Sequence, residues 1–160
     1  MSIIITPNEV NLIDVFKKLN VPYQLENLLI GDIHIRKDEK TIYILERKAK
    51  GDLDGSIKDG RYKEQKARLI ESGISKKNII YIIENLQRPP NDSCKKRVWS
   101  AICNTQHRDG FTIFPTKNID ETVNYLKTLA DSVTKFTQAS YNESSPPSET
   151  EKVVNINIKK

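Results

Sequence analysis

The sequence predicts an α/β domain with a central mixed sheet flanked by helices on both faces, and three observations support this prediction. The run Ile79–Ile83 is apolar throughout, as expected of a strand that is buried on both faces of a sheet. Apolar residues alternate over 33–35 and again over 42–44, on either side of a polar turn at 37–40, which favours a β-hairpin. Segments of strand and helix character alternate along 160 residues, the length of a single domain.

The first part of the chain is expected to hold one helix and four strands. The β-branched run Ile3–Ile5 is stopped by Thr6 and Pro7, and apolar residues then recur at helical spacing. The expected elements are a strand at 3–5, a helix from Val10 to about Leu19, and strands at 23–27, 28–35 and 41–46.

The second part is expected to alternate helices and strands. Leu53 and Ile57 lie four residues apart after Asp52, and Gly73 stops a longer helix. The residues at 91–93 offer N-caps for the next helix. The expected elements are a helix from Gly60 or Arg61 to about Glu71, strands at 79–83 and 110–114, a helix to about Gln106, and a last helix from Asn118 or Asp120 that carries Val123, Leu126, Leu129 and Val133.

Residues 1–137 are expected to form one folded domain, and residues 138–160 a polar tail. The stretch QASYNESSPPSETEK is dominated by Ser, Pro, Glu and Thr and has few apolar residues. Such a composition buries too little apolar surface to offset the entropy of ordering the chain. We therefore expect the tail to be disordered.

Composition excludes several classes of protein. No apolar run approaches the roughly 20 residues that span a bilayer. The N-terminus lacks the basic stretch and cleavage site of a signal peptide, so we expect an intracellular protein. Cys94 and Cys103 are then expected to be reduced thiols that behave as small buried hydrophobes, since their spacing also fits no zinc pattern.

The basic charge of the chain is concentrated in one stretch. The net charge is +5, and residues 36–77 alone hold thirteen basic and eight acidic side chains, which is the whole surplus. A concentrated basic segment indicates a polyanionic partner, most commonly nucleic acid, although a solvated helix face gives similar counts.

A group of charged residues at the expected hairpin indicates metal-dependent chemistry. Asp32 lies on one strand, and Glu46 and Lys48 end the other, where period-two geometry places them on one face and Arg47 on the opposite face. Asp52 follows at the start of the next helix. Carboxylates that converge with a lysine can hold a hard cation such as Mg²⁺ for phosphodiester hydrolysis.

These residues resemble a known family. The stretch GD…ERKAKGDL…SIKDGRYKEQKARL is similar to the catalytic domain of the XPF/Mus family of structure-selective DNA endonucleases, closest to its Mus-type catalytic subunit, and the resemblance covers roughly residues 25–130. It implies a restriction-endonuclease-like fold, dependence on Mg²⁺ or Mn²⁺, and cleavage of branched double-stranded DNA such as flaps, forks and nicked junctions in repair, recombination or replication.

The resemblance also implies roles for individual residues. The acids Asp32, Glu46 and Asp52 would hold or lie near the metal, and Lys48 would position the attacking water. Arg47 would be structural or bind phosphate. The basic segment would bring further side chains to the DNA or to the site, namely Arg61, Lys63, Gln65, Lys66 and Arg68.

The sequence departs from the family in two places. Thr6 stands where the family usually has the Asp of an Asp-x-x-Glu motif, and Glu9 stands at the position of its Glu. Glu9 either compensates for the missing Asp as a metal ligand or is only an acid stabilised by the dipole of the following helix. A tandem helix-hairpin-helix module usually follows the nuclease domain, whereas this sequence passes into a polar tail, so we expect either that the module is missing or that the chain is a fragment.

Other interpretations remain at this point. The chain could be a non-catalytic DNA-binding or scaffolding subunit of a nuclease heterodimer, or a regulatory protein that binds a partner through its basic helix. A homodimer or heterodimer is expected through about Trp99–Leu129, and a location in the nucleus or at sites of DNA replication. His34 is interpreted as structural, His107 as compensating a helix dipole, and Trp99 as core or interface.

Overall fold

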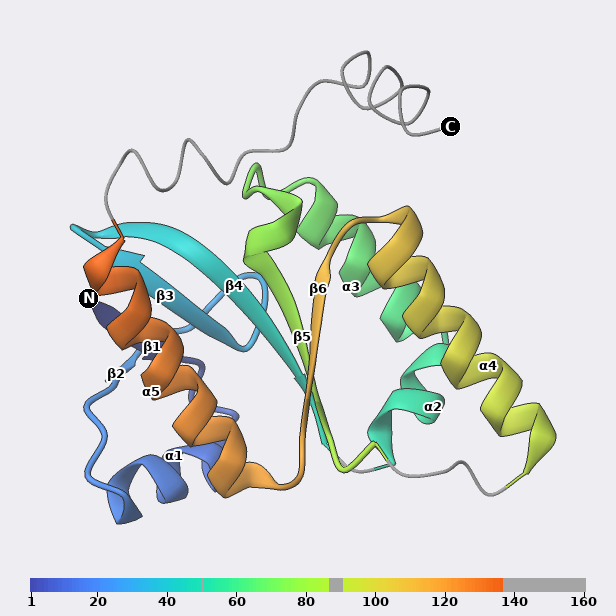
Figure 1. Ribbon diagram of the computed structural model, residues 1–160, viewed down its shortest axis with the longest axis horizontal. Coiled ribbons are helices and arrows are strands. Elements are labelled where there is room, and N and C mark those ends of the chain that lie inside the picture. Colours follow the sequence, from blue (N-terminus) through green and yellow to red (C-terminus); the bar gives the residue numbers. More distant parts are fainter. Residues whose placement is uncertain (50, 87–90, 137–160) are drawn as a thin grey trace, which may run out of the picture.

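The computed structural model describes residues 1–49, 51–86 and 91–136 (Figure 1). Its strands are β1 (Ser2–Ile5), β2 (Gln24–Leu25), β3 (Ile33–Lys37), β4 (Lys40–Lys48), β5 (Ile79–Glu84) and β6 (Thr112–Thr116). Its helices are α1 (Val10–Lys18), α2 (Asp52–Lys58), α3 (Arg61–Ile70), α4 (Asp92–Cys103) and α5 (Ile119–Lys135), with a 3-10 turn η1 (Lys76–Asn78) and a π-helical turn η2 (Asn104–Arg108).

The strands form one mixed sheet of six in the order β2-β1-β3-β4-β5-β6. β3 runs antiparallel to both β1 and β4, whereas β4, β5 and β6 are parallel. A parallel connection needs a crossover, and the chain makes these crossovers through helices. The predicted α/β class with a central mixed sheet is confirmed.

Each face of the sheet has its own hydrophobic core. One core includes Leu12 and Phe16 of α1 and Val123 and Leu126 of α5, and the other is covered by α2, α3 and α4, as Figure 1 shows. β5 serves both cores: Ile80 and Ile82 join the first, and Ile79, Tyr81 and Ile83 join the second. The prediction that this strand is buried on both faces is confirmed, since all its residues are buried.

Several predicted boundaries are wrong. The strand expected at 28–35 begins only at Ile33, because Gly31 adopts a positive φ of 75° that interrupts an extended chain. The helix expected to run to Gln106 changes to a π-helical turn at Asn104. The last strand lies at Thr112–Thr116 instead of 110–114 and includes Pro115, which an edge strand tolerates.

Two expectations about individual side chains are corrected by their exposure. Cys94 and Cys103 are both free thiols, but only Cys94 is buried. Trp99 was expected in the core or at an interface, and its 51% exposure rules out the core and leaves the interface as a prediction. The polar tail expected at 138–160 lies outside the described residues. Within the described ranges, no helix is long and apolar enough to cross a membrane.

Candidate active site

The last three residues of β4 direct charged side chains to the two faces of the sheet. Ile44 belongs to the core beneath α2–α4 and Leu45 to the core beneath α1 and α5, and this alternation continues along the strand. Glu46 and Lys48 therefore lie on the α2–α4 face, and both are buried, at 5% and 6% exposed. Arg47 points to the other face, as predicted.

Asp32 is attached to β4 through its backbone and its side chain. Its N–H donates to the Leu45 carbonyl (2.9 Å), and its carboxylate Oδ2 accepts from the Arg47 N–H (2.8 Å). The preceding Gly31 permits this close approach, because a Cβ at that position would lie 2.5 Å from Cγ2 of Ile44. Asp32 is thus held beside Glu46.

Glu46 and Asp32 form a pair of hydrogen-bonded carboxyl groups. The pKa of Glu46 is raised to about 8, mainly by burial, with added contributions from the charge of Asp32 and the hydrogen bond between the two groups, while Lys48 opposes the shift. Near neutral pH, Glu46 therefore holds a proton that a divalent cation could replace. This donor set fits a hard cation such as Mg²⁺ or Mn²⁺.

The amino group of Lys48 is oriented by a residue of α3. Lys48 Nζ donates to Gln65 Oε1 at 2.7 Å, and Gln65 is half-buried. This contact turns the Gln65 side chain toward Lys48 and agrees with the site-supporting role expected for Gln65. Its expected contact with DNA stays a prediction.

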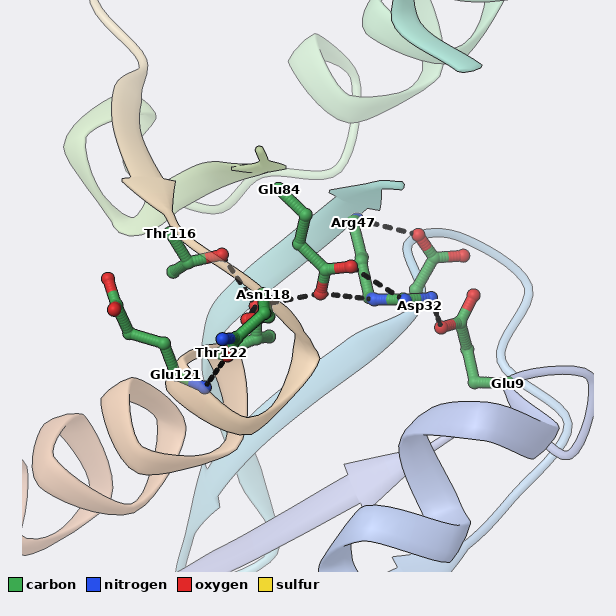
Figure 2. Close-up of polar contacts among 8 residues, drawn as sticks. All are labelled: Glu9, Asp32, Arg47, Glu84, Thr116, Asn118, Glu121 and Thr122. Atoms are coloured by element: carbon green, nitrogen blue, oxygen red, sulfur yellow. Dashed lines mark hydrogen bonds and ion pairs between the residues drawn. The ribbon is translucent and has the colours of Figure 1, made fainter. Parts of the chain in front are cut away.

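Arg47 lies in a group of ion pairs on the α1/α5 face, which Figure 2 shows. Its guanidinium donates to both carboxylate oxygens of Glu84 (2.7 and 2.8 Å) and to Glu9 (2.8 Å). Only 11% of the Arg47 side chain is exposed. The structural alternative for Arg47 therefore fits, and the phosphate-binding alternative does not, because both acidic partners would have to leave first.

Glu9 lies near Asp32 but bonds to Arg47. Burial is the main cause that raises the pKa of Glu9, and the charge of Asp32 adds to it, while Arg47 lowers it. Glu9 is therefore close enough to Asp32 to respond to its charge, although its carboxylate is already hydrogen-bonded. Thr6 lies beside Asp32 as well, since its N–H donates to the Asp32 carbonyl at 3.1 Å.

The third expected acid is not part of the carboxyl pair. Asp52 is the first residue of α2 and is exposed. Among the described residues, no three Asp, Glu, His or Cys side chains come together as a metal-binding group. The expected set of four metal-binding acids is thus represented by the pair of Asp32 and Glu46, with Glu9 bonded to Arg47 and Asp52 at the surface.

The basic helix α3 separates into exposed and buried cations. Arg61, Lys63 and Arg68 are exposed, and the Arg61 guanidinium pairs with Asp59 (2.7 Å). Lys66, expected within reach of the site, is instead buried and pairs with Asp109 at 2.9 Å. The first three remain available to an external polyanion.

Sequence reasoning missed two residues that support Arg47: Glu84, which bonds to its guanidinium, and Thr122, which bonds to Glu84. Glu84 is buried at the end of β5, and its Oε2 also accepts from the hydroxyl of Thr122 on α5 (2.7 Å). The one available signal was an acid placed directly after a fully apolar strand.

His34 is buried with Nε2 at 2.7 Å from the Ile30 carbonyl oxygen, and burial lowers its pKa, which agrees with its structural interpretation.

The fold is an α/β domain with a mixed six-stranded sheet, and its site is a pair of carboxyl groups beside a lysine at the end of β4. The structure is similar to that of XPF from Aeropyrum pernix in complex with DNA, with a TM-score of 0.71 and 23% sequence identity, and the match covers 84% of this chain and 65% of that chain. The sequence pattern of the ERCC4 domain matches residues 5–129. The chain belongs to the ERCC4 domain family, as the resemblance predicted.

Curated relatives carry a more specific description. The chain is 42% identical over 113 residues to a protein named crossover junction endonuclease mus81 from Emericella nidulans, and the match covers 66% of this chain. It is 35% identical over 130 residues to crossover junction endonuclease MUS81 from Oryza sativa subsp. japonica, covering 77% of this chain. The matched regions make up only 16% and 19% of those two proteins.

Proposed function

We propose that this chain is the nuclease domain of a structure-selective DNA endonuclease that hydrolyses phosphodiester bonds in branched DNA. The observation that supports this most directly is the half-buried Asp32 paired with the buried Glu46 beside the buried Lys48. Membership of the ERCC4 domain family and the names of the curated relatives support the same reaction.

Asp32 and Glu46 would hold a Mg²⁺ or Mn²⁺ ion. Such an ion supplies a Lewis acid for the phosphate and lowers the pKa of a bound water. Both residues offer carboxyl oxygens in fixed positions, because the Arg47 N–H fixes Asp32 and β4 fixes Glu46. Glu46 must lose its proton to become a ligand, so metal binding and proton release are coupled.

Lys48 would offset negative charge that develops on the phosphate or orient the attacking water. Its amino group is buried and has a defined partner in Gln65, so it enters the reaction already oriented. A preorganised positive group in a site that excludes water contributes more to the transition state than the same group in solvent.

The DNA backbone would contact the exposed cations of α3. Arg61, Lys63 and Arg68 belong to the same helix as Gln65, which connects the surface contacts to the site. Phosphate contacts of this kind are independent of sequence, and they agree with selection of a DNA shape over a base sequence.

We propose further that the chain acts in the nucleus as part of a homodimer or heterodimer. Supporting the dimer is the exposure of Trp99 (51%) and Phe114 (37%) in the C-terminal half. The apolar stripe of α5 does not supply such an interface, because Val123, Leu126 and Val133 are fully buried in the domain's own core.

A cleavage assay tests the proposed function. Labelled duplex, 3′-flap, fork and nicked-junction DNA are incubated with the full chain in Mg²⁺, Mn²⁺ or EDTA, with Glu46→Gln alongside. We expect cutting of branched substrates that EDTA and Glu46→Gln both abolish. Glu71→Gln removes an exposed acid at the end of α3 and is the matched control, which we expect to cut normally.

Binding without cleavage would contradict the proposal. If the wild-type chain binds branched DNA but cuts none of it in either metal, the interpretation as a non-catalytic DNA-binding subunit replaces the nuclease. Cleavage that persists in Glu46→Gln would instead show that the site has been placed on the wrong residues.

A further inference from the structure

Glu84 is a buried acid, and both of its carboxylate oxygens accept hydrogen bonds. It is 6% exposed and lies where β5 ends. Its two carboxylate oxygens accept from Nε and Nη2 of Arg47, and Oε2 also accepts from Thr122 Oγ1. Two parallel hydrogen bonds of this kind fix both the position and the plane of the guanidinium, whereas a single hydrogen bond would let it rotate.

Arg47 connects this contact to the candidate metal site. Its side chain bonds to Glu84 and Glu9, and its backbone N–H donates to Asp32 Oδ2 at 2.8 Å (Figure 2). Arg47 thus forms ion pairs through its side chain on one face of the sheet and, through its backbone, holds a candidate metal ligand just before β3. Any rotation of the Arg47 peptide would shift the donor on which Asp32 depends.

A directed series of hydroxyl groups fixes Glu84 in turn. A carboxylate can only accept, so the Thr122 hydroxyl donates to Glu84 (2.7 Å), with the Asn118 carbonyl as a longer second acceptor (3.3 Å). The contact between the Thr116 and Thr122 hydroxyls (2.7 Å) then runs from Thr116 to Thr122. Thr122 lies in the first turn of α5, where Asn118 caps the helix by accepting from the Glu121 N–H (2.9 Å).

We propose that Glu84, fixed by Thr122, is a positioning residue that sets the Arg47 peptide and, through it, the orientation of Asp32. The role in catalysis rests on the proposed function, but the positioning itself does not. It makes the N-terminus of α5 part of the support of the site, although α5 covers the opposite face of the sheet. Outer residues that orient a metal ligand typically change metal affinity or activity 10–100-fold when they are altered.

Hydrogen exchange measures the positioning without any reaction. In Glu84→Gln, which keeps the side-chain volume, we expect the Arg47 amide to exchange at least about tenfold faster, because its acceptor Asp32 is no longer held in place. The amides within β5, such as those of Ile80 and Ile82, should keep their exchange rates. A merely structural role would accelerate the whole sheet together.

Kinetics measure the consequence for the reaction. We expect kcat to fall about 10–100-fold in Glu84→Gln while KM for branched DNA stays within about twofold, since no DNA contact is lost. Thr122→Val removes only the hydroxyl and should show the same pattern with a smaller loss. Thr128→Val is the matched control on α5, because the Thr128 hydroxyl bonds to the Asn124 carbonyl (2.8 Å) of its own helix.

The outcomes separate the two proposals. Unchanged exchange of the Arg47 amide in Glu84→Gln, or equal acceleration across the sheet, would overturn the positioning role. So would a kcat loss in Thr128→Val as large as that in Thr122→Val. If the wild-type chain cuts nothing while the Arg47 amide still responds selectively, the positioning role stands and the proposed nuclease function fails.

Discussion

Residues 46–48 of β4 present charge to both faces of the sheet, and the two faces neutralise it differently. On the α1/α5 face, the Arg47 guanidinium has complementary partners in Glu84 and Glu9. On the α2–α4 face, the buried Glu46 is hydrogen-bonded to another carboxyl group, while Lys48 bonds to the neutral Gln65. On the first face the charged groups are paired by other residues of the chain, whereas on the second face a bound cation would stabilise the carboxyl pair.

The difference shows how a binding site can be rigid and yet charged. An isolated buried carboxylate is costly, so a strand that carries one needs support from its other residues. Here the ion pairs on the α1/α5 face anchor β4 to β5, α1 and α5. The opposite face, beneath α2–α4, can then retain the unfavourable pair of Asp32 and Glu46. Perturbing each face in turn tests this division.

The largest effect is expected from Arg47→Met. Removing the guanidinium leaves the buried Glu84 and the half-buried Glu9 without a counter-charge, and breaking a buried ion pair such as that with Glu84 costs about 3–5 kcal/mol. Denaturant unfolding should show this loss in the free energy of unfolding. Arg97→Met removes a more exposed partner of Asp54 and should cost much less, because solvent screens an exposed ion pair. Equal losses in the two variants would contradict the division between the faces.

A loss of rate without a comparable loss of stability is expected from Lys48→Met. If the amino group acts on charge that develops in the transition state, as proposed, kcat should fall about 10²–10³-fold, or roughly 3–4 kcal/mol, while KM changes little. Steady-state cleavage of fork DNA measures both constants. Lys40→Met, at the exposed opposite end of β4, is the control. A rise in KM as large as the fall in kcat would assign Lys48 to ground-state phosphate binding.

An unusual dependence of stability on pH is expected from Glu46. Its pKa is raised from 4.5 to about 8 in the folded protein, mainly by burial, so between these values the folded state binds the proton more tightly than the unfolded state. In metal-free buffer, the free energy of unfolding should therefore decrease as pH rises through this window, by at most about 1.4 kcal/mol per pH unit.

Thermal unfolding from pH 5 to 8 in EDTA measures this dependence. Glu46→Gln should flatten the profile and raise Tm at pH 8, because the amide has no proton to lose. The exposed Glu71→Gln variant should retain the wild-type slope. A wild-type profile that rises across the same window would argue against a proton held by the carboxyl pair.

The smallest effect is expected from the exposed cations of α3. Arg61→Ala removes one phosphate contact and should reduce the slope of log K against log salt by about one, with little change in stability. Fluorescence anisotropy of branched DNA at several salt concentrations gives this slope. Lys66→Ala is a useful contrast, because Lys66 is buried against Asp109 and should lose stability without changing the slope. An unaltered slope in Arg61→Ala would remove it from the DNA surface.

Periodicity predicted much of this site from the sequence. The alternation along 44–48 placed Glu46 and Lys48 together and Arg47 opposite, because a strand leaves no other choice of face. The apolar run at 79–83 likewise required a strand within the sheet. The boundary at 28–35 was wrong because Ile30 packs against a core from an irregular segment, and an apolar residue alone does not reveal the backbone conformation.

Contacts between distant segments could not be read in the same way. Glu84 meets Arg47 because parallel register pairs Arg47 with Ile82, and nothing in either strand's sequence fixes that register. Lys66 has the spacing of an exposed basic helix, and its burial depends on Asp109, 43 residues away. Asp52 illustrates the same limit, since proximity in sequence to Glu46 did not bring it into the carboxyl pair.

Because β4 places functional side chains on both faces of the sheet, it tolerates insertions and deletions poorly. Inserting or deleting one residue among 46–48 would exchange the faces of the remaining side chains. The carboxyl pair and the arginine contacts would then be lost in a single event, whereas a point substitution affects only one of them. We therefore expect gaps in comparisons of this segment to fall outside β4, at turns such as 38–39, where the chain reverses at the surface.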